Sequence, residues 1–387
     1  YLRSDIIWSN CLSGTIPIFA RSKNGYIRTD LRELYRLRGC ADLSIPSRDG
    51  WARIKSIEYV GRKKVKRIVL RDGYWITCTD EHRFIVGGSL VEAKDLRKGH
   101  ILASSKLTLF DFWADIADYH FGRIVGWFMA EGTYDKMGAV RFSMHIDEGG
   151  VAEEIGITLK NRFGATYRIH RYGKSLILVA TSRAVVGAIQ EFVEDKGARR
   201  KHFARSVWNT NRSFIKGIVD GWLEGDGHKD ERGEDFWTFG ISYNRELIED
   251  LRCACNVIGY NFRSKIAWAR YQNGKKLSIR GTIRKGRSGY HTEKCGTEII
   301  AIEQLAASQD CYDIEVDSAD HLFLLPNGVA VHNSNPMPES VQDRPTKSHE
   351  YVFLLAKSPQ YFYDADAIRE PSICADPESA SYRKHGK

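Results

Sequence analysis

The sequence predicts an all-β domain that is split by an α/β insertion. Short runs of β-branched and aromatic residues, separated by turn signals, fill residues 11–108 and return in residues 291–333. Between them, residues 109–290 alternate long amphipathic segments with pairs of strand-like runs. Residues 1–10 and 334–387 flank this pattern without joining it. We therefore expect one β domain built from two distant segments and a second domain inserted between them.

The composition is that of a globular protein with room for more than one domain. The chain has 387 residues, of which 42% are hydrophobic and 28% charged, which suits two or three domains with separate cores. No apolar run approaches the length of a membrane helix, and the first residues lack the pattern of a signal peptide. A cytoplasmic protein without a membrane partner is expected.

The charge favours a polyanionic partner. The formal net charge is +9, from 58 Lys and Arg against 49 Asp and Glu. Basic clusters lie at "GRKKVKR" (61–67), "GARRKHFAR" (197–205) and "RGTIRKGR" (280–287), close to aromatic and strand-like residues. This pattern suits a nucleic-acid surface, although ordinary solubilising charges explain any one cluster equally well. The eight cysteines form no CxxC pair, so neither a zinc site nor a disulfide framework is indicated.

The β segments can be divided into individual strands. Alternating or apolar runs bounded by glycine and polar turns predict strands in "TIPIFARSKNGYI", "ARIKSIEYVG", "KRIVLRDGYWITC" and "HRFIVGG" of the first segment. The second segment predicts further strands in "GTEIIAIEQL", "CYDIEVD" and "HLFLLPNGVAVHN".

The insertion contains an internal repeat. "FGRIVGWFMAEG" (121–132) and "IKGIVDGWLEGDG" (215–227) align so that each carries three small residues four apart. Residues at this spacing share one helix face and allow two helices to approach closely. The matched residues are Gly122, Gly126 and Ala130 in the first helix and Gly217, Gly221 and Gly225 in the second.

The segments after each helix repeat as well. "SMHIDEGGVAEEIGITLKNRFG" and "GISYNRELIEDLRCACNVIG" each read as a strand end, a helix and a glycine stop. Strand pairs then follow at 165–180 and 260–281. One chain therefore supplies both halves of a pseudo-twofold unit, and a monomer is expected.

Each glycine-striped helix ends in an acid. Glu131 and Asp226 follow the stripes in the same register. If the helices pack side by side, the two carboxylates meet at one end and repel each other unless a cation lies between them, for which Mg²⁺ is the natural choice. Paired carboxylates with divalent metals suit phosphodiester hydrolysis. Simple capping acids in a glycine-rich core are the alternative, which the repetition disfavours.

The repeated motifs carry a resemblance. "IVGWFMAEG" and "VDGWLEGDG" resemble the two LAGLIDADG motifs of homing endonucleases, over roughly residues 109–285. This resemblance implies an αββαββα half repeated twice, with two saddle-forming sheets that read long double-stranded DNA sites. It also implies metal binding by Glu131, where Asp is the commoner residue, and by Asp226. Lys265, in a second-half strand, is the candidate for a lysine that assists cleavage.

The boundaries of the β segments carry reactive side chains. Cys11 opens the first segment, and "VHNSNPMPES" (331–340) closes the second with His332, Asn333 and Ser334. The amide of an asparagine can attack its own main-chain carbonyl and cut the following peptide bond, and a preceding histidine can protonate the departing nitrogen. A thiol at one boundary, with an asparagine and a hydroxyl at the other, is what protein splicing requires.

Further polar residues lie within the segments. "TCTDEHRFIV" contains Thr79 and His82 in a TxxH spacing, and "CYDIEVDSADHLFLL" contains Asp313 and His321. Each residue alone is more often a core histidine or a turn cap. Together with Cys11 and the Asn333 boundary, they resemble the splicing blocks of cysteine-initiated inteins, and the resemblance implies the HINT β fold over roughly 11–108 and 291–333.

The resemblance assigns the first splicing step. Cys11 would attack the carbonyl of Asn10 to form a thioester, while His82 protonates the amide nitrogen and Thr79 orients the site. Asp313 would accept the thiol proton, because a thiol needs such activation at neutral pH.

The later steps fall to the other junction. Ser334 would attack the thioester to give a branched ester, and Asn333 would cyclise with the help of His332 and His321. The ester would then relax to a new amide between Asn10 and Ser334. Splicing itself needs no cofactor.

The flanks, once joined, resemble a segment of bacterial and phage DNA methyltransferases acting on adenine N6 or cytosine N4. The glycine-rich S-adenosylmethionine loop and the DPPY-type tetrapeptide are absent, so the flanks are interpreted as host fragments. The alternative is a methyltransferase fragment with a DNA-recognition insertion that never excises, which would not need Cys11, His332, Asn333 and Ser334. A hedgehog-like domain that cleaves without ligating would not need Ser334 or the host-like segment after it.

Overall fold

The computed structural model describes residues 11–39, 42–107, 117–135, 138–195, 197–231, 233, 235–271, 274–285 and 297–332. The chain divides into two compact units, Tyr1–Asn335 and Pro336–Lys387, and the second lies outside the described residues. Within the described residues, no helix is both long enough and apolar enough to cross a membrane. The expected domain boundaries near 108 and 290 also fall outside them.

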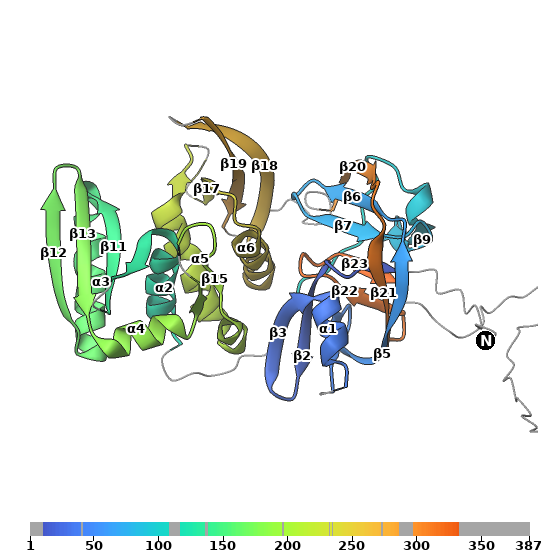
Figure 1. The fold of residues 1–387 in the computed structure, drawn as a ribbon, viewed down its shortest axis with the longest axis horizontal. Coiled ribbons are helices and arrows are strands. Elements are labelled where there is room, and N and C mark those ends of the chain that lie inside the picture. Colours follow the sequence, from blue (N-terminus) through green and yellow to red (C-terminus); the bar gives the residue numbers. More distant parts are fainter. Residues whose placement is uncertain are drawn as a thin grey trace, which may run out of the picture. The chain divides into compact units, whose positions relative to one another are not determined.

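The two β segments interleave in one large sheet. Its strand order is β20-β6-β7-β1-β21-β5-β4-β2-β3, so strands from the second segment lie among strands from the first (Figure 1). The nine strands are β1 (Leu12–Ser13), β2 (Pro17–Ser22), β3 (Gly25–Asp30), β4 (Ser44–Ser47), β5 (Gly50–Lys63), β6 (Lys66–Leu70), β7 (Trp75–Cys78), β20 (Ile299–Gln304) and β21 (Gln309–Val316). The long antiparallel pairing of β21 with β5 joins the segments.

A smaller sheet completes this β region. Its order is β22-β23-β8-β9, built from β8 (Arg83–Val86), β9 (Ser89–Glu92), β22 (Leu322–Leu324) and β23 (Ala330–His332). A core of aliphatic and aromatic side chains from both segments packs between the strands.

One helix interrupts the expected all-β pattern. Helix α1 (Leu31–Leu37) begins because Asp30 caps it, with its carboxylate accepting the Glu33 N–H at 2.8 Å. Leu31 and Leu34, three residues apart, are buried on one face. A short 3₁₀ helix, η1 (Ala93–Asp95), follows β9.

The insertion repeats its element order. The first half contains α2 (Tyr119–Glu131), β10 (Gly132–Tyr134), β11 (Ala139–His145), η2 (Ile146–Glu148), α3 (Gly149–Phe163), β12 (Thr166–Tyr172), β13 (Ser175–Thr181) and α4 (Arg183–Gln190). The second half contains α5 (Arg212–Asp226), β16 (Gly227–Lys229), β17 (Phe236–Ser242), α6 (Arg245–Ile258), β18 (Asn261–Tyr271) and β19 (Gly274–Arg284). The short β14 (Val193–Glu194), β15 (His202–Phe203) and η3 (Arg205–Asn209) link the halves. The sheets have equivalent orders, β10-β11-β13-β12 and β16-β17-β19-β18.

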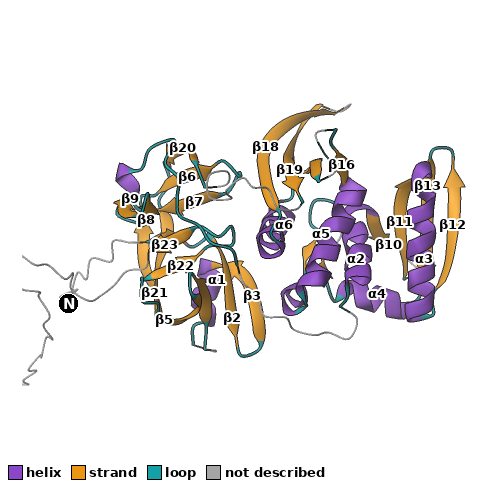
Figure 2. Ribbon diagram, turned by 180° about the vertical axis from the view of Figure 1, so that it is seen from behind, coloured by secondary structure: helices purple, strands orange, loops and turns teal. Residues whose placement is uncertain are grey.

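The glycine stripes bring α2 and α5 into backbone contact (Figure 2). A Cβ added to Gly126 would lie 2.1 Å from the Ile218 carbonyl oxygen, and one added to Gly221 would lie 2.0 Å from the Arg123 oxygen. No larger side chain fits at either position, so the predicted close packing is confirmed. The pseudo-symmetry extends to the first turns, where Asp118 and Asn211 cap α2 and α5 in the same way.

Candidate active sites

The first site surrounds Cys11, which is fully buried. Strand β1 begins at the next residue and pairs with both β7 and β21, so Leu12 faces Cys78 on one side and Tyr312 on the other. Thr79, directly after β7, forms two hydrogen bonds with Cys11. The Cys11 N–H donates to the Thr79 hydroxyl at 3.3 Å, and the Thr79 N–H donates to the Cys11 carbonyl at 3.0 Å. The nitrogen of the proposed scissile bond is therefore held by the residue expected to orient it.

Strand register places a carboxylate opposite the thiol. Leu12 pairs with Tyr312 and Ser13 with Cys311 in an antiparallel ladder. Continuing this ladder by one residue beyond β1 places Cys11 next to Asp313, whose charge acts on the thiol. Both side chains are buried. Burial, followed by the nearby charge of Asp313, raises the pKa of the Cys11 thiol far above its usual range. The thiol is therefore neutral at pH 7, and attack requires a base to take its proton.

His82 lies at the other end of the same turn as Thr79. This turn joins β7 to β8, and the His82 N–H donates to the Thr79 carbonyl at 3.3 Å. The imidazole is buried and packs edge-on against Phe84, with 4.9 Å between ring centroids. Because Phe84 of β8 pairs with Val331 of β23, the strands beside His82 and His332 are neighbours.

The remaining predicted histidines also approach each other. Leu322 of β22 pairs with His332 of β23, and the ring centroids of His321 and His332 lie 6.3 Å apart. His321 has a φ of 54°, a left-handed conformation that is uncommon for a residue other than glycine. Its N–H donates to the Ser318 carbonyl at 3.1 Å. Asn10, Asn333 and Ser334, the other predicted splicing residues, lie outside the described residues.

The second site lies at the C-terminal ends of α2 and α5. Glu131 and Asp226 are the last residues of these helices, and both side chains are half-buried. Burial, followed by the charge of Asp226, raises the pKa of Glu131, and burial raises the pKa of Asp226. The two predicted acids are thus brought close enough to interact electrostatically.

The donor set of this second site fits a hard divalent cation. Two carboxylates whose pKa values are raised by burial are stabilised in their charged form when a cation lies between them. Among the described residues, no group of three or more His, Cys, Asp or Glu side chains is arranged so that it could hold a metal ion. Mg²⁺ suits a two-carboxylate site, because it commonly retains several waters and takes other oxygens from a substrate phosphate.

A third charged residue of this site was missed. Lys201 is buried, and its Nζ donates to the carbonyls of Phe128 at 2.8 Å and Gly132 at 3.0 Å, on either side of Glu131. Burial lowers the pKa of Lys201 to about 8, although the charges of Asp226 and Glu131 oppose this shift. The residue belongs to the basic cluster 197–205, which was expected to be either a nucleic-acid surface or ordinary solubilising charge, and the burial of Lys201 fits neither interpretation. Nothing in that run of basic residues distinguishes it from Arg199 or Arg200.

The predicted lysine, Lys265, has a different setting. Its side chain is exposed on β18, where it lines a surface hollow together with Arg263, Arg280 and Arg284. Ile266 and Trp268 of the same strand are also exposed. In the first half, β12 exposes Arg168, His170 and Tyr172, which lie at every second position of the strand and therefore on one face. Each sheet thus presents basic and aromatic side chains to solvent.

Comparison with known proteins gives short or distant matches. No protein-family profile matches the chain. The type II methyltransferase M.SmaI of Serratia marcescens is 57% identical over 44 residues, covering 11% of this chain and 14% of that protein. M.Cfr9I of Citrobacter freundii is 52% identical over 48 residues, covering 12% and 16%. An iron-sulfur cluster assembly SufBD family protein of Mycobacterium bovis, Mb1496, is 22% identical over 263 residues, covering 63% and 30%. The chain thus spans less than a third of the length of each of these three proteins.

Similar solved structures include inteins and LAGLIDADG homing endonucleases. A DnaB intein from Synechocystis sp. PCC 6803 has 9% identity and a TM-score of 0.29, covering 84% of this chain and 99% of that one. The homing endonuclease I-DmoI, solved with its target DNA in the presence of manganese, has 10% identity and a TM-score of 0.32, covering 42% and 86%. The N-terminal LAGLIDADG domain of DUF199/WhiA has 13% identity and a TM-score of 0.28, covering 44% and 78%. These values are too low to assign the chain to a family.

Proposed function

We propose that residues 11–333 form a self-splicing intein of the cysteine-initiated class, which excises itself and joins Asn10 to Ser334. One observation carries this proposal: Cys11 is buried, its N–H and its carbonyl are both hydrogen-bonded to Thr79, and the charge of the buried Asp313 acts on its thiol. A cysteine with only a structural role needs neither a nearby carboxylate nor a hydroxyl that accepts a hydrogen bond from its main-chain N–H. Both are what thiol attack on the preceding peptide bond requires.

The first step exchanges an amide for a thioester. The Cys11 Sγ attacks the Asn10 carbonyl carbon, and Asp313 accepts the thiol proton. His82 donates a proton to the Cys11 nitrogen as the carbon–nitrogen bond breaks, which leaves a free amine. Thr79 fixes the orientation of that nitrogen through its hydroxyl. The burial of Cys11 limits the access of water, which would otherwise hydrolyse the thioester.

The later steps transfer the acyl group and release the insertion. The Ser334 hydroxyl attacks the thioester, so an ester forms and the Cys11 thiol is regenerated. The Asn333 side-chain amide then attacks its own main-chain carbonyl and forms a succinimide, while His332, supported by His321, protonates the departing Ser334 nitrogen. That amine attacks the ester and completes the amide with Asn10.

The insertion is proposed to be a site-specific endonuclease of the LAGLIDADG class acting on double-stranded DNA. Glu131 and Asp226 would hold Mg²⁺, which, when bound, stabilises the attacking and leaving oxygens of phosphodiester hydrolysis. Lys201 fixes the carbonyls on either side of Glu131 and offsets the charge of the two acids. The basic and aromatic side chains on the two sheets would contact the DNA backbone and grooves.

The relatives of the chain support an inserted element. Two short matches at high identity are to methyltransferases, whereas a match over 263 residues is to a protein named for iron-sulfur cluster assembly. An element carried by unrelated hosts produces such a pattern. The DNA site is accordingly proposed to span the codons for Asn10 and Ser334 in an uninterrupted methyltransferase gene, because the insertion would destroy that site.

The variant Asn333→Ala tests both activities at once. It should block release at the C-terminal junction and leave cutting of a plasmid carrying the uninterrupted site intact, in the presence of Mg²⁺. Mass spectrometry measures cleavage at the C-terminal junction, and gel electrophoresis measures cutting of the plasmid. Release of residues 334–387 from this variant would contradict the splicing proposal. No cutting by the parent protein would contradict the endonuclease proposal.

A further inference from the structure

Helix α6 of the insertion is anchored to the β segments by a buried arginine. Arg252 donates from Nη1 to the Asp72 carbonyl at 2.8 Å and forms an ion pair with the Asp72 carboxylate at 3.4 Å. Its other nitrogens bond Glu249 at 3.2 Å and Ser264 at 3.0 Å. The Ser264 N–H also donates to the Asp72 carbonyl at 2.9 Å. Asp72, in the turn between β6 and β7, is therefore fixed by residues that belong to the insertion.

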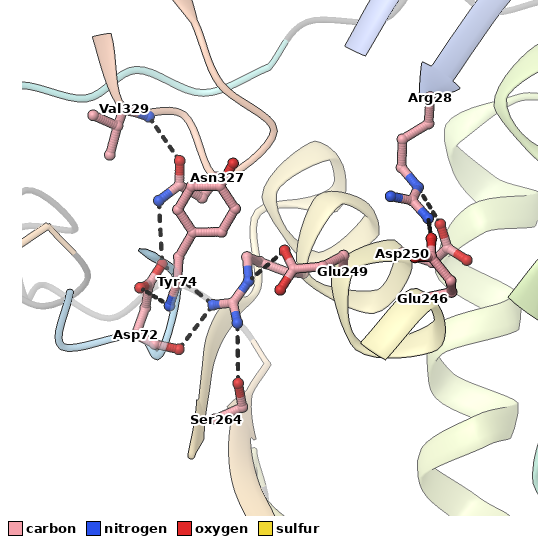
Figure 3. Close-up of polar contacts among 10 residues, drawn as sticks. Arg28, Asp72, Tyr74, Glu246, Glu249, Asp250, Ser264, Asn327 and Val329 are labelled. Atoms are coloured by element: carbon pink, nitrogen blue, oxygen red, sulfur yellow. Dashed lines mark hydrogen bonds and ion pairs between the residues drawn. The ribbon is translucent and has the colours of Figure 1, made fainter. Parts of the chain in front are cut away.

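Asp72 in turn contacts the loop that leads to the C-terminal junction (Figure 3). The Asn327 side-chain amide donates to the Asp72 carboxylate at 3.5 Å, and its oxygen accepts the Val329 N–H at 3.2 Å. Val329 directly precedes β23, the strand that ends at His332. The contacts thus run from Arg252 through Asp72 and Asn327 to the start of the strand that carries His332.

A second residue of α6 encloses the same turn. Gly328 has a φ of 86°, and a Cβ there would lie 2.7 Å from the side-chain nitrogen of Asn256. The Asn256 oxygen accepts the Leu107 N–H at 3.2 Å, and the Ser105 N–H donates to the Gly328 carbonyl at 2.8 Å. The turn is therefore held between residues of α6 and the segment 105–107.

Burial makes the Arg252 contacts necessary. Arg252 and Asp72 are 3% and 6% exposed, so neither charge is stabilised by water. Burial raises the pKa of Asp72, and the charge of Arg252 opposes this rise. Without the guanidinium, Asp72 must either gain a proton or move toward solvent, and both changes disturb the carboxylate oxygen that Asn327 contacts.

We propose that Arg252 is a positioning residue for cleavage at the C-terminal junction, so that the inserted domain holds the strand on which the splicing reaction depends. This inference rests on the proposed splicing function. The contacts given for Cys11, with Thr79 and across β1, come from the β segments, and the Asp72 turn reaches them only through the length of β7.

The test compares the two junctions in full-length Arg252→Gln. Cleavage at Cys11 is measured by adding dithiothreitol, which releases residues 1–10 from the thioester, and cleavage after Asn333 is measured by mass spectrometry in the same sample. The C-terminal rate should fall between about 10-fold and about 100-fold, because the strand loses its alignment. The N-terminal rate should stay within about twofold of the parent rate, since its own contacts are unchanged.

The chain offers a matched control in Arg28→Gln. Arg28 of β3 forms ion pairs with Asp250 and Glu246 of α6 (Figure 3). The variant therefore also breaks a buried ion pair to α6. Among the described residues, no contact joins Arg28 to the turn that contains Asn327 and Gly328. This variant should lose comparable thermal stability and keep the parent ratio of the two cleavage rates. The double variant Asp72→Asn, Arg252→Gln removes both charges and should recover most of the C-terminal rate.

The outcomes distinguish the positioning role of Arg252 from the splicing function on which it rests. Equal slowing at both junctions in Arg252→Gln, or the same selective loss in Arg28→Gln, would overturn the positioning role while splicing stands. A parent protein that reacts at neither junction would contradict the splicing function instead. If Arg252→Gln fails to fold, Asn327→Ala, which leaves the Arg252 ion pair intact, must show the same selective loss at the C-terminal junction.

Discussion

The two candidate sites are built in opposite ways. The Cys11 site brings together residues from distant parts of the sequence, and Cys11, Thr79, His82 and Asp313 are each at most 5% exposed. The Glu131 and Asp226 site uses equivalent positions of two repeated helices and leaves the carboxylates half-buried. One site is specified by sheet register, and the other by duplication of a helix.

This difference matches the chemistry proposed for each site. Burial raises the pKa of Cys11 and of both acids, but with different consequences. A raised thiol pKa keeps the nucleophile neutral until a neighbouring base acts, which suits a reaction between parts of one chain. Raised carboxyl pKa values favour a bound cation, and partial exposure leaves room for DNA. A dry site suits intramolecular acyl transfer, whereas an open one suits an external substrate.

Cys11→Ala should give the largest effect, because it removes the nucleophile. Ligation of the flanks should be lost entirely, slow cleavage after Asn333 should remain, and plasmid cutting should be unchanged. Intact mass and plasmid assays measure these outcomes. Cys311→Ala is the control, since this thiol is also buried beside Cys11; it should still ligate. Ligated product from Cys11→Ala would show that another group attacks.

Glu131→Gln and Asp226→Asn should each reduce DNA cutting at least about 10³-fold, because each removes a proposed ligand of the divalent cation. DNA binding, measured by gel shift, and splicing should persist, since neither acid contacts the splicing site. Glu154→Gln, at an acid that pairs with Arg123 on the surface of α3, is the control and should cut normally. Cutting that survives in both acid variants would remove these carboxylates from the mechanism.

Asp313→Asn should slow the first splicing step between about 10² and about 10⁴-fold, the range for losing a positioned base. Because the thiol pKa is raised, the proton must then pass to hydroxide from solvent. The residual rate should rise about tenfold for each pH unit between 6 and 9, a steeper dependence than in the parent. Dithiothreitol-induced cleavage at Cys11 measures both the rate of the first step and its dependence on pH. A variant with the parent pH profile would exclude Asp313 as the proton acceptor.

Lys201→Met should lower DNA cutting by about tenfold or more, because a positive charge facing the two acids is lost. Lys265→Met, on the exposed sheet, should change cutting by less than about twofold if its contacts are only to phosphate. The parent profile should be bell-shaped. Cutting falls at low pH as Glu131 and Asp226 gain protons at their raised pKa values, and falls above about pH 8 as Lys201 loses its proton. Equal effects of the two lysine variants would contradict this distinction.

The smallest predicted effects concern stability. Gly126→Ala should cost about 2 kcal/mol or more, since its Cβ would meet the Ile218 carbonyl. Gly187→Ala in α4 meets nothing within 4 Å and should instead stabilise by about 0.5 kcal/mol. Urea unfolding in a Cys11→Ala, Asn333→Ala background, which blocks the reaction at both junctions and keeps the chain intact, compares the two glycine variants. Equal stabilities would mean that the α2–α5 packing tolerates a wider spacing.

Part of this architecture could be predicted from the sequence because it is periodic. The glycine stripe repeats every four residues and ends in an acid twice, so packing of α2 on α5 followed directly. The thiol and asparagine at the β boundaries are recognisable because they occur at the ends of the predicted segments. The facing of Cys11 and Asp313, in contrast, depends on strand register, which local sequence does not reveal.

Other features could not be predicted because burial alone distinguishes them. Lys201 resembles its basic neighbours in sequence, yet only its side chain turns inward to the Phe128 and Gly132 carbonyls. Arg252 likewise looks like a charge on an amphipathic helix until the β segments cover it. The sequence indicated only that one domain is inserted in the other, and the Arg252 contacts with Asp72 join the insertion to the β segments.

The intact mass of the purified chain over time tests the central claim most directly. Under reducing conditions at neutral pH, the 387-residue precursor should give a 323-residue species, residues 11–333, and a ligated 64-residue product that joins residues 1–10 to 334–387. The ligated product should be absent from Cys11→Ala. A folded precursor that persists at full length, with neither product formed, would contradict the account.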